Sequence, residues 1–131
     1  MTEVRQEFFG LSISDVKDMK TRQTQQYDLP SDECVAKIRE VLTKMGAILH
    51  ENKKQKFIVA DNFQKAFRSC IDTTQVGILV TPWEATKSQV DVSSYNADLA
   101  IFVSRNISEK LRPEKKDEQK VEPKEGQQVI N

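Results

Sequence analysis

The sequence predicts an α+β fold, in which a mostly antiparallel sheet carries two main helices on one face, as a two-layer sandwich. Two segments, residues 32–45 and 96–111, have apolar side chains at helical spacing. The other apolar runs are short and are separated by turn residues, as is typical of strands. Strands and helices do not alternate strictly along the chain, which disfavours a doubly wound parallel sheet.

The length of 131 residues fits one domain, and the polar ends are predicted to lie outside it. We expect a flexible leader or tether over residues 1–20, a single α+β domain over residues 21–111, and a disordered charged tail over residues 112–131. The tail is rich in lysine, glutamate and glutamine and lacks apolar periodicity, so it offers no face to bury.

One apolar cluster, Phe8-Phe9-Gly10-Leu11, lies in the leader, and Ile13 and Val16 follow it at helical spacing. This spacing predicts one or two helical turns that begin near Ser12 or Ser14. Two adjacent phenylalanines near a terminus are costly to leave in water. We expect them either to pack against the domain or to dock onto a partner protein, and the sequence leaves both interpretations open.

Residues 21–29 are predicted to form an edge strand that ends at Pro30. Thr24 and Tyr27 have side chains that favour strands. The run is rich in glutamine and has little apolar alternation, which indicates a strand at the edge of the sheet.

Residues 32–45 give the clearest helix. Ser31 is the predicted N-cap, and Asp32 and Glu33 follow in the first turn, where the helix dipole favours acids. Gly46 is predicted to end the helix in the left-handed conformation. One apolar stripe runs along the segment: Val35, Ile38, Val41, Leu42 and Met45.

Two apolar runs, residues 47–51 and 56–60, flank a polar turn and predict a hairpin. Residues 61–72 are ambiguous. Phe63, Phe67 and Cys70 have a spacing that favours a short helix, and a further strand is the competing interpretation.

Residues 75–81 are nearly continuously apolar and predict a central strand that ends at Pro82. Residues 86–92 alternate between apolar and polar side chains and predict another strand. Ser94 or Asn96 is then expected to cap the second long helix. Its predicted buried stripe is Leu99, Phe102, Val103, Ile107 and Leu111.

Composition and charge exclude several classes of function. Lys plus Arg and Asp plus Glu both number 20, so the net charge is zero, which argues against a general nucleic-acid binder. No apolar run reaches the roughly 18 residues of a membrane span. No signal peptide is present, so the protein is either cytoplasmic or a mature chain whose signal was removed.

No motif for catalysis, for a metal or for a phosphate is present, so we predict a protein with no enzymatic activity and no cofactor. His50 is the only histidine, and no Ser, Cys or carboxylate lies at a sequence spacing from it that is typical of a catalytic site. Cys34 and Cys70 fit neither a zinc site nor a redox motif. We expect two buried thiols, with a disulfide as the alternative in an oxidising compartment.

Trp83 is the only tryptophan, and it lies where a predicted strand gives way to a loop. Half-buried packing is one interpretation of this position. The other is an anchor for a protein interface, because an indole at the end of a strand is suited to a contact hot spot.

The run Arg22-Gln23-Thr24-Gln25-Gln26-Tyr27-Asp28 precedes a helix that ends at Gly46, and a predicted strand pair follows. This arrangement, over residues 22–60, resembles a group of small bacterial envelope lipoproteins of unknown function. The resemblance implies a location on the periplasmic side of the outer membrane. It also implies attachment to the membrane through a lipid on a cysteine that this chain lacks near Met1, with residues 1–20 as the tether. It implies no activity for any residue here.

We therefore predict a non-enzymatic protein-binding domain of the bacterial cell envelope that acts in assembly or as a scaffold. One alternative is a small-molecule-binding protein or enzyme with a pocket between the sheet and the helix of residues 96–111. The other is a cytoplasmic regulatory subunit. The partner, the oligomeric state and the strand order stay open. The predicted partner-binding residues are Phe8, Phe9, Arg22, Gln25, Tyr27 and Trp83.

Overall fold

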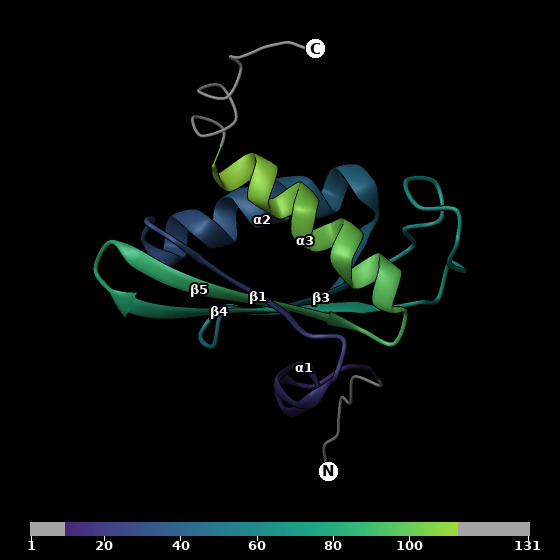
Figure 1. Cartoon of the computed structure of the whole chain (residues 1–131), viewed down its shortest axis with the longest axis horizontal. Helices are drawn as coiled ribbons and strands as arrows, with labels where there is room; N and C mark the ends of the chain where they lie inside the picture. The colour runs from purple at the N-terminus through teal and green to yellow at the C-terminus, as the bar shows by residue number, and fades with distance from the viewer. Residues whose placement is uncertain (1–9, 113–131) are drawn as a thin grey trace, which may run out of the picture.

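The computed structural model describes residues 10–112. Its elements are α1 (Ile13–Asp18), β1 (Gln23–Tyr27), α2 (Ser31–Met45), β2 (Ala47–Asn52), β3 (Phe57–Asp61), β4 (Val76–Glu84), β5 (Lys87–Ser94) and α3 (Ala97–Leu111). The five strands form one sheet in the order β1-β5-β4-β3-β2, and every neighbouring pair is antiparallel (Figure 1). The predicted α+β class is confirmed.

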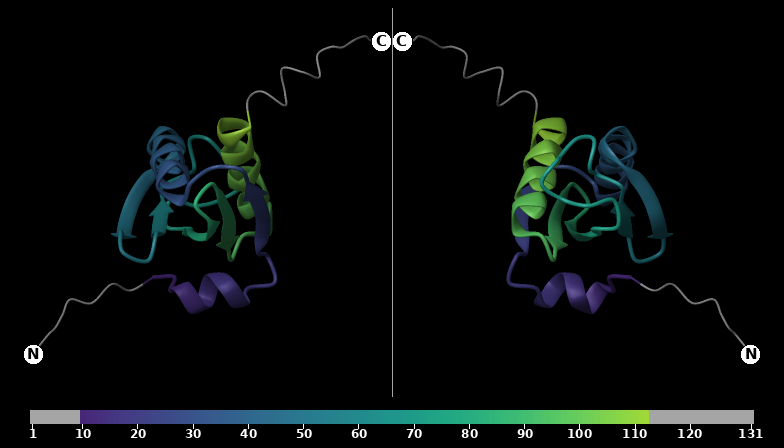
Figure 2. Two further views of the ribbon diagram at one scale, coloured as in Figure 1. Left: turned by 90° about the vertical axis from the view of Figure 1, so that its left-hand side faces the viewer. Right: turned by 90° about the vertical axis from the view of Figure 1, so that its right-hand side faces the viewer.

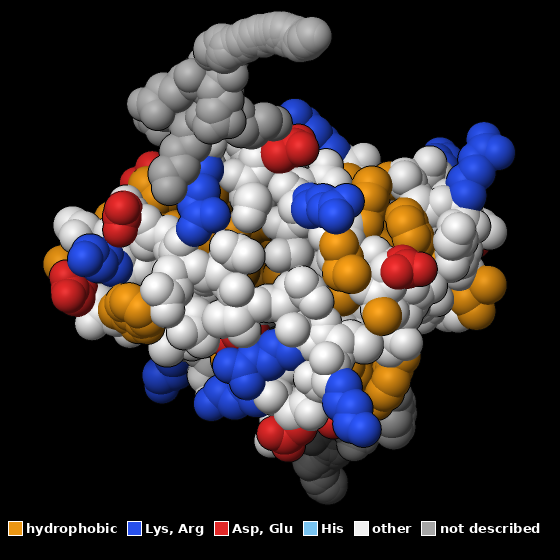
Figure 3. Space-filling model, in the orientation of Figure 1, with side chains coloured by type: hydrophobic (Ala, Val, Ile, Leu, Met, Phe, Trp, Pro, Cys, Tyr) orange, Lys and Arg blue, Asp and Glu red, His pale blue; other side chains and the backbone are white. Residues whose placement is uncertain are grey.

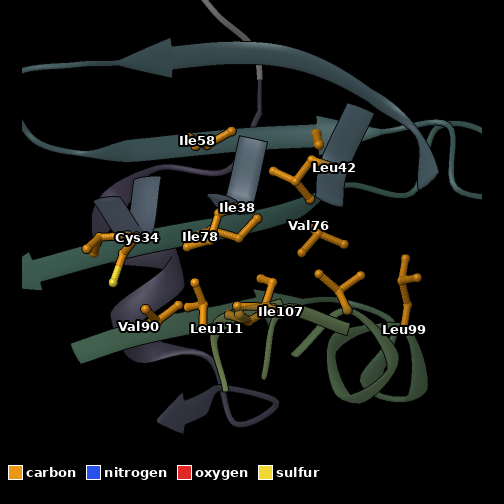
Figure 4. Packing of buried hydrophobic residues seen from close by; sticks show 14 of the residues in the cluster. Cys34, Ile38, Leu42, Ile58, Val76, Ile78, Val90, Leu99, Ile107 and Leu111 are labelled. Atoms are coloured by element: carbon orange, nitrogen blue, oxygen red, sulfur yellow. The ribbon is translucent and has the colours of Figure 1, made fainter. Parts of the chain in front are cut away.

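The larger core lies between one face of the sheet and the helices α2 and α3 (Figure 4). Ile38 and Leu42 of α2 and Ile107 of α3 are fully buried there. They pack with Val76 and Ile78, alternate residues of the central strand β4. The core therefore joins the two long helices through the middle of the sheet.

The predicted edge strand is β1, which forms one end of the sheet, and the predicted hairpin is the β2–β3 pair. The second long helix begins after Asn96, whose side chain accepts a hydrogen bond from the amide of Leu99. It runs to Leu111 as predicted, and of its predicted stripe only Phe102 keeps part of its surface exposed. The sequence patterns identified these elements correctly.

The other face of the sheet carries α1, on the side opposite α2 and α3 (Figure 2). Leu11 and Val16 are buried there against apolar side chains of β3 and β4. Residues 10–20 thus belong to the folded unit, and the predicted start of the domain at residue 21 is wrong. The helix α1 adds a third layer over part of the sheet. Phe8 and Phe9 and the tail beyond residue 112 lie outside the described residues.

Gly77 of β4 allows α1 to lie this close to the sheet. A Cβ atom at this position would lie 2.4 Å from Cγ2 of Val16, which is far inside van der Waals contact. Ser93, the register neighbour of Gly77 in β5, donates its hydroxyl to the carbonyl of Val16 at 2.7 Å. Packing and one buried hydrogen bond therefore hold α1 in place.

Both predicted ends of α2 need correction. The N-cap is Pro30, with no side-chain cap hydrogen bond, because the helix already includes Ser31. Gly46 has a φ of −162°, which is extended and not left-handed. Its lack of a side chain serves a close approach instead, since a Cβ atom would lie 2.4 Å from the carbonyl oxygen of Asp61.

The predicted helix over residues 61–72 is wrong. The segment forms a loop with turns, and in the first of them the amide of Phe67 donates to the carbonyl of Phe63 at 2.8 Å. Asn62 precedes this turn with a φ of 64°, a left-handed conformation that a helix does not accommodate. Phe63 and Cys70 are buried, so the apolar spacing reflects how the loop is anchored to the core.

The strand β4 does not end at Pro82 as predicted but continues to Glu84. Pro82 pairs with Ser88 of β5, whereas β3 pairs with β4 only as far as Leu79. Pro82 therefore lies where β4 has a neighbour on one side only, and such edge positions tolerate proline. The β4–β5 hairpin extends beyond the body of the sheet and carries Trp83.

Candidate functional site

The described surface is hollowed where α3 lies beside the edge strand β1. This groove, the β1 groove, has a volume of about 640 Å³ and is open to solvent. Its size is that of a ligand or peptide site. Its lining combines uncharged polar side chains and one apolar side chain with three charged ones: Gln23 and Gln25 of β1, Ile101, Ser104, Arg105, Ser108 and Glu109 of α3, and Arg112.

A second hollow, the Trp83 pocket, adjoins the C-terminal end of β1 and has a volume of about 430 Å³. Tyr27, Trp83, Lys87 and Arg112 line it. The indole of Trp83 is 50 % exposed, which is unusual for a side chain of this size. Arg112 also lines the β1 groove, so the two hollows share a wall.

Tyr27 is fixed between the sheet and α3. Its side chain is buried, and its hydroxyl lies 2.6 Å from the hydroxyl of Ser108. The guanidinium of Arg112 stacks over the ring at 4.3 Å from the centroid. Burial raises the pKa of Tyr27, while the Ser108 hydrogen bond and the charge of Arg112 act against that rise. The phenol is therefore neutral at physiological pH and acts as a rigid structural element.

The main-chain groups of β1 face β5 and the solvent in alternation. At the end of β5, the amide and the carbonyl of Ser94 both bond to the hydroxyl of Thr21, just before β1. Counting back from Ser94, every second residue of β5 therefore directs its amide and carbonyl towards β1. The register partners of these residues in β1 are Gln23, Gln25 and Tyr27. Thr24 and Gln26 consequently direct their amides and carbonyls away from the sheet.

Arg112 reaches this free edge. Its Nη2 donates to the outward carbonyl of Gln26, and its Nη1 donates to Oε1 of Gln25 at 3.4 Å. In Figure 3, β1 crosses the middle of the face, which is mostly uncharged, with cationic side chains above and below it. The β1 edge is therefore polar, nearly free of charge, and contacted by one arginine.

The opposite side of β1 is fastened by Asp91 of β5, a carboxylate that is only 1 % exposed. It accepts from Nε of Arg22 at 2.9 Å, from the hydroxyl of Thr24 at 2.6 Å and from Nε2 of Gln89 at 3.2 Å. Nη1 of Arg22 also donates to the carbonyl of Lys17, a residue of α1. This network links β1 and the residues before it to β5 and α1.

The structure brings together three of the residues predicted for partner binding. Gln25 lines the β1 groove, and Tyr27 and Trp83 line the Trp83 pocket beside it. Arg22 is engaged with Asp91 on the other face, where it acts as an anchor. Sequence reasoning missed Arg112, because it was assigned to the tail, and Ser108, because a serine within a helical pattern gives no signal.

None of the groups considered for chemistry lines these two hollows. His50 is partly buried and packs edge-on against the ring of Phe57, with 6.3 Å between the centroids. Cys34 and Cys70 are free and buried, so the expected pair of buried thiols is confirmed over the disulfide. Burial raises the pKa of both thiols, which keeps them protonated and poorly nucleophilic.

Within residues 10–112, no cluster of three or more His, Cys, Asp or Glu side chains is arranged to hold a metal ion. Over the same range, no helix has the length and apolar character needed to cross a membrane. Comparison of the chain with protein-family models, with curated proteins and with solved structures found no significant match. Any functional assignment therefore depends on the physical properties of the site.

Proposed function

We propose that this chain is a non-enzymatic protein-binding domain that takes up an extended strand of a partner along β1. One observation carries the proposal: β1 presents the amides and carbonyls of Thr24 and Gln26 outward, on an edge with no charged residue and no register shift. Main-chain groups that have no strand partner on a regular edge are a template for strand addition.

The neighbouring hollows supply places for the side chains of such a strand. Alternate side chains of an added strand would point towards α3, where the β1 groove offers Ile101 and the amide of Gln25. At the end of β1, the half-exposed Trp83 and the cation of Lys87 border the Trp83 pocket. Main-chain pairing would supply affinity, and these hollows would supply specificity.

A location in the bacterial cell envelope, with a lipid anchor outside this chain, is part of the proposal and is supported by the resemblance of residues 22–60 alone. A signal sequence and a lipidation cysteine upstream in the gene would support this location. A gene that begins at Met1 would contradict it.

Site-specific photo-crosslinking in the native cell tests strand addition. Gln25→benzoylphenylalanine places the probe in the β1 groove, and Leu49→benzoylphenylalanine places it on β2, the other edge strand. We expect a crosslinked species from position 25 only. It should disappear when Gln26→Pro removes the outward amide and persist with the control Gln26→Ser. A crosslink that survives Gln26→Pro, or one of equal strength from position 49, contradicts the proposal.

A small-molecule-binding function is the second candidate, because the β1 groove lies between the sheet and the C-terminal helix, where that alternative requires a pocket. Ser104→Trp would fill the groove and leave the outward groups of β1 unchanged. If a small molecule is the ligand, fragment binding detected by NMR at Ile101 and Ser108 should be abolished by Ser104→Trp. No fragment binding at these residues would remove this candidate.

A further inference from the structure

We propose that the strand taken up at β1 is β1 of a second copy of this chain, so that two sheets join edge to edge around a two-fold axis. The inference rests on the proposed function and names the partner of the same edge. It specifies antiparallel pairing centred on Gln25, because this register overlaps all five residues of β1.

The strand β1 is complementary to itself. In this register, the outward amide and carbonyl of Thr24 meet the outward carbonyl and amide of Gln26 in the second copy, and the symmetric pair forms in the same way. The two Gln25 side chains lie opposite each other on the α3 side. Because a primary amide both donates and accepts hydrogen bonds, two facing glutamine side chains can hydrogen-bond to each other. This pairing removes no charged group from water.

The position of α3 leaves room for the second copy. The helix packs over β5 as well as β1, so its axis is set back from the edge of the sheet. With strands about 4.8 Å apart, two α3 helices set back by half a strand spacing would lie roughly 10 Å apart, near the distance at which helices pack. Ser104 and Ser108, two small residues, line the groove between α3 and the edge.

The charge distribution favours the same partner. Acidic and basic residues number 20 each, so two copies have no net repulsion to overcome. Arg105 and Glu109 lie one turn apart on the wall of the β1 groove. Two-fold symmetry makes the two α3 helices antiparallel, which directs Arg105 of each copy towards Glu109 of the other.

Pairing has one local competitor, Arg112, which donates to the outward carbonyl of Gln26. An arriving strand replaces this donor with the amide of Thr24 from the second copy. The guanidinium keeps its contact with the ring of Tyr27, 4.3 Å from the centroid, which does not involve the edge. The exchange therefore costs two hydrogen bonds of Arg112, one to the carbonyl of Gln26 and one of 3.4 Å to Oε1 of Gln25, and it forms the main-chain ladder and the glutamine pair in their place.

Sedimentation equilibrium of the full chain, from micromolar to millimolar concentration, tests the inference. We expect a monomer–dimer equilibrium for the wild type. Gln25 faces Gln25 of the second copy, so Gln25→Lys and Gln25→Glu each place two like charges together. Each should raise the dissociation constant of the dimer at least roughly tenfold. An equimolar mixture of the two variants should restore dimers, since each pair then joins opposite charges. Circular dichroism checks that both variants, changed at an exposed residue, keep the fold.

Three results would overturn the inference: a wild type that stays monomeric, a dimer insensitive to both substitutions, or variants whose mixture does not restore the dimer. The proposed function fails separately. If the wild type is monomeric and a crosslink from position 25 to a different protein is still lost in Gln26→Pro, strand addition stands and the second copy is excluded. If no crosslink from position 25 depends on Gln26, strand addition itself fails.

Discussion

The two edges of the sheet differ in how they meet solvent. At one end, β1 pairs with β5 without a register shift and has no charged side chain. At the other end, β2 shifts register between Ile48 and His50, which displaces Leu49. An ion pair of 3.2 Å between Arg39 of α2 and Glu51 also crosses to β2.

Bulges and charges are the means by which natural sheets prevent an edge from pairing with another strand. The β2 edge has both, and β1 has neither within its five residues. The comparison indicates that the fold closes one edge and leaves the other available. The edges are also anchored differently, since β1 depends on the buried Asp91 and β2 begins at the close contact of Gly46 with Asp61.

The largest effect is expected from Asp91→Ala, which tests how β1 is held. The change leaves Arg22, Thr24 and Gln89 without their shared acceptor, so we expect a loss of about 2–3 kcal/mol in the free energy of unfolding. Urea denaturation measures it, with Asp18→Ala, at an exposed position, as the control. A loss below about 0.5 kcal/mol would mean that the main-chain ladder alone holds β1.

Gly46→Ala probes the start of the β2 edge. The added Cβ atom would meet the main-chain oxygen of Asp61 at 2.4 Å, and main-chain atoms cannot move aside cheaply. We expect a loss of about 1–3 kcal/mol in thermal or chemical unfolding. Ala47→Ser, at the exposed neighbouring residue, serves as the control and should change stability little. Equal stability of the two variants would show that β2 tolerates a shift of its first residue.

Tyr27→Phe tests how much one hydrogen bond contributes to holding β1 against α3. It removes the hydroxyl that lies 2.6 Å from the hydroxyl of Ser108 and keeps the ring. We expect a loss of about 1 kcal/mol, measured by urea denaturation. Asn106→Ala, which removes a side-chain bond on α3 away from the grooves, gives a comparison within the same helix. An unchanged stability would mean that packing alone positions the ring.

The same tyrosine gives a pH dependence with a defined sign. Burial is the largest cause of the raised pKa of Tyr27, so the folded state holds the phenolic proton above pH 10, where the unfolded state releases it. Stability is therefore unaffected by this group below about pH 10 and falls as pH rises through the raised pKa. Phenolate absorbance of Tyr95→Phe, which leaves Tyr27 as the only tyrosine, should show a midpoint above 10. A midpoint at or below 10 would contradict the burial of Tyr27.

The smallest effect is expected from Arg39→Gln, which removes the ion pair that crosses from α2 to β2. Both side chains are partly exposed, so the pair contributes no more than about 0.5 kcal/mol. Its role at the edge is to keep a charge near β2, and the register shift remains without it. Self-association of this variant should match that of the wild type, and a new dimer through β2 would show that the charge is the main barrier there.

The sequence predicted those parts of the fold that depend on local pattern. The apolar stripes of α2 and α3 and the apolar run of β4 mark side chains that pack in the core. The glutamines of β1 mark a strand with mostly exposed side chains. The predictions failed where distant contacts decide the structure. The position of α1 depends on the missing side chain of Gly77, and the loop after β3 takes its apolar spacing from anchoring to the core.

The candidate site could be predicted in part for the same reason. Tyr27 and Trp83 are large side chains next to turn signals, and the pocket that they line was identifiable from them in this way. Arg112 could not be identified, because its role comes from the end of α3 lying beside β1. Asp91 alternates with buried valines, and this pattern gave no sign that its carboxylate is buried and bonded to Arg22 and Thr24.

Residue-resolved amide hydrogen exchange, followed over a series of protein concentrations, tests most directly whether β1 is the edge that pairs with β1 of a second copy. We expect the amides of Thr24 and Gln26 to exchange quickly in dilute solution and to become protected as the concentration rises, while amides of β2 do not change. Rates at Thr24 and Gln26 that stay constant, or protection that grows at β2 instead, would contradict this assignment.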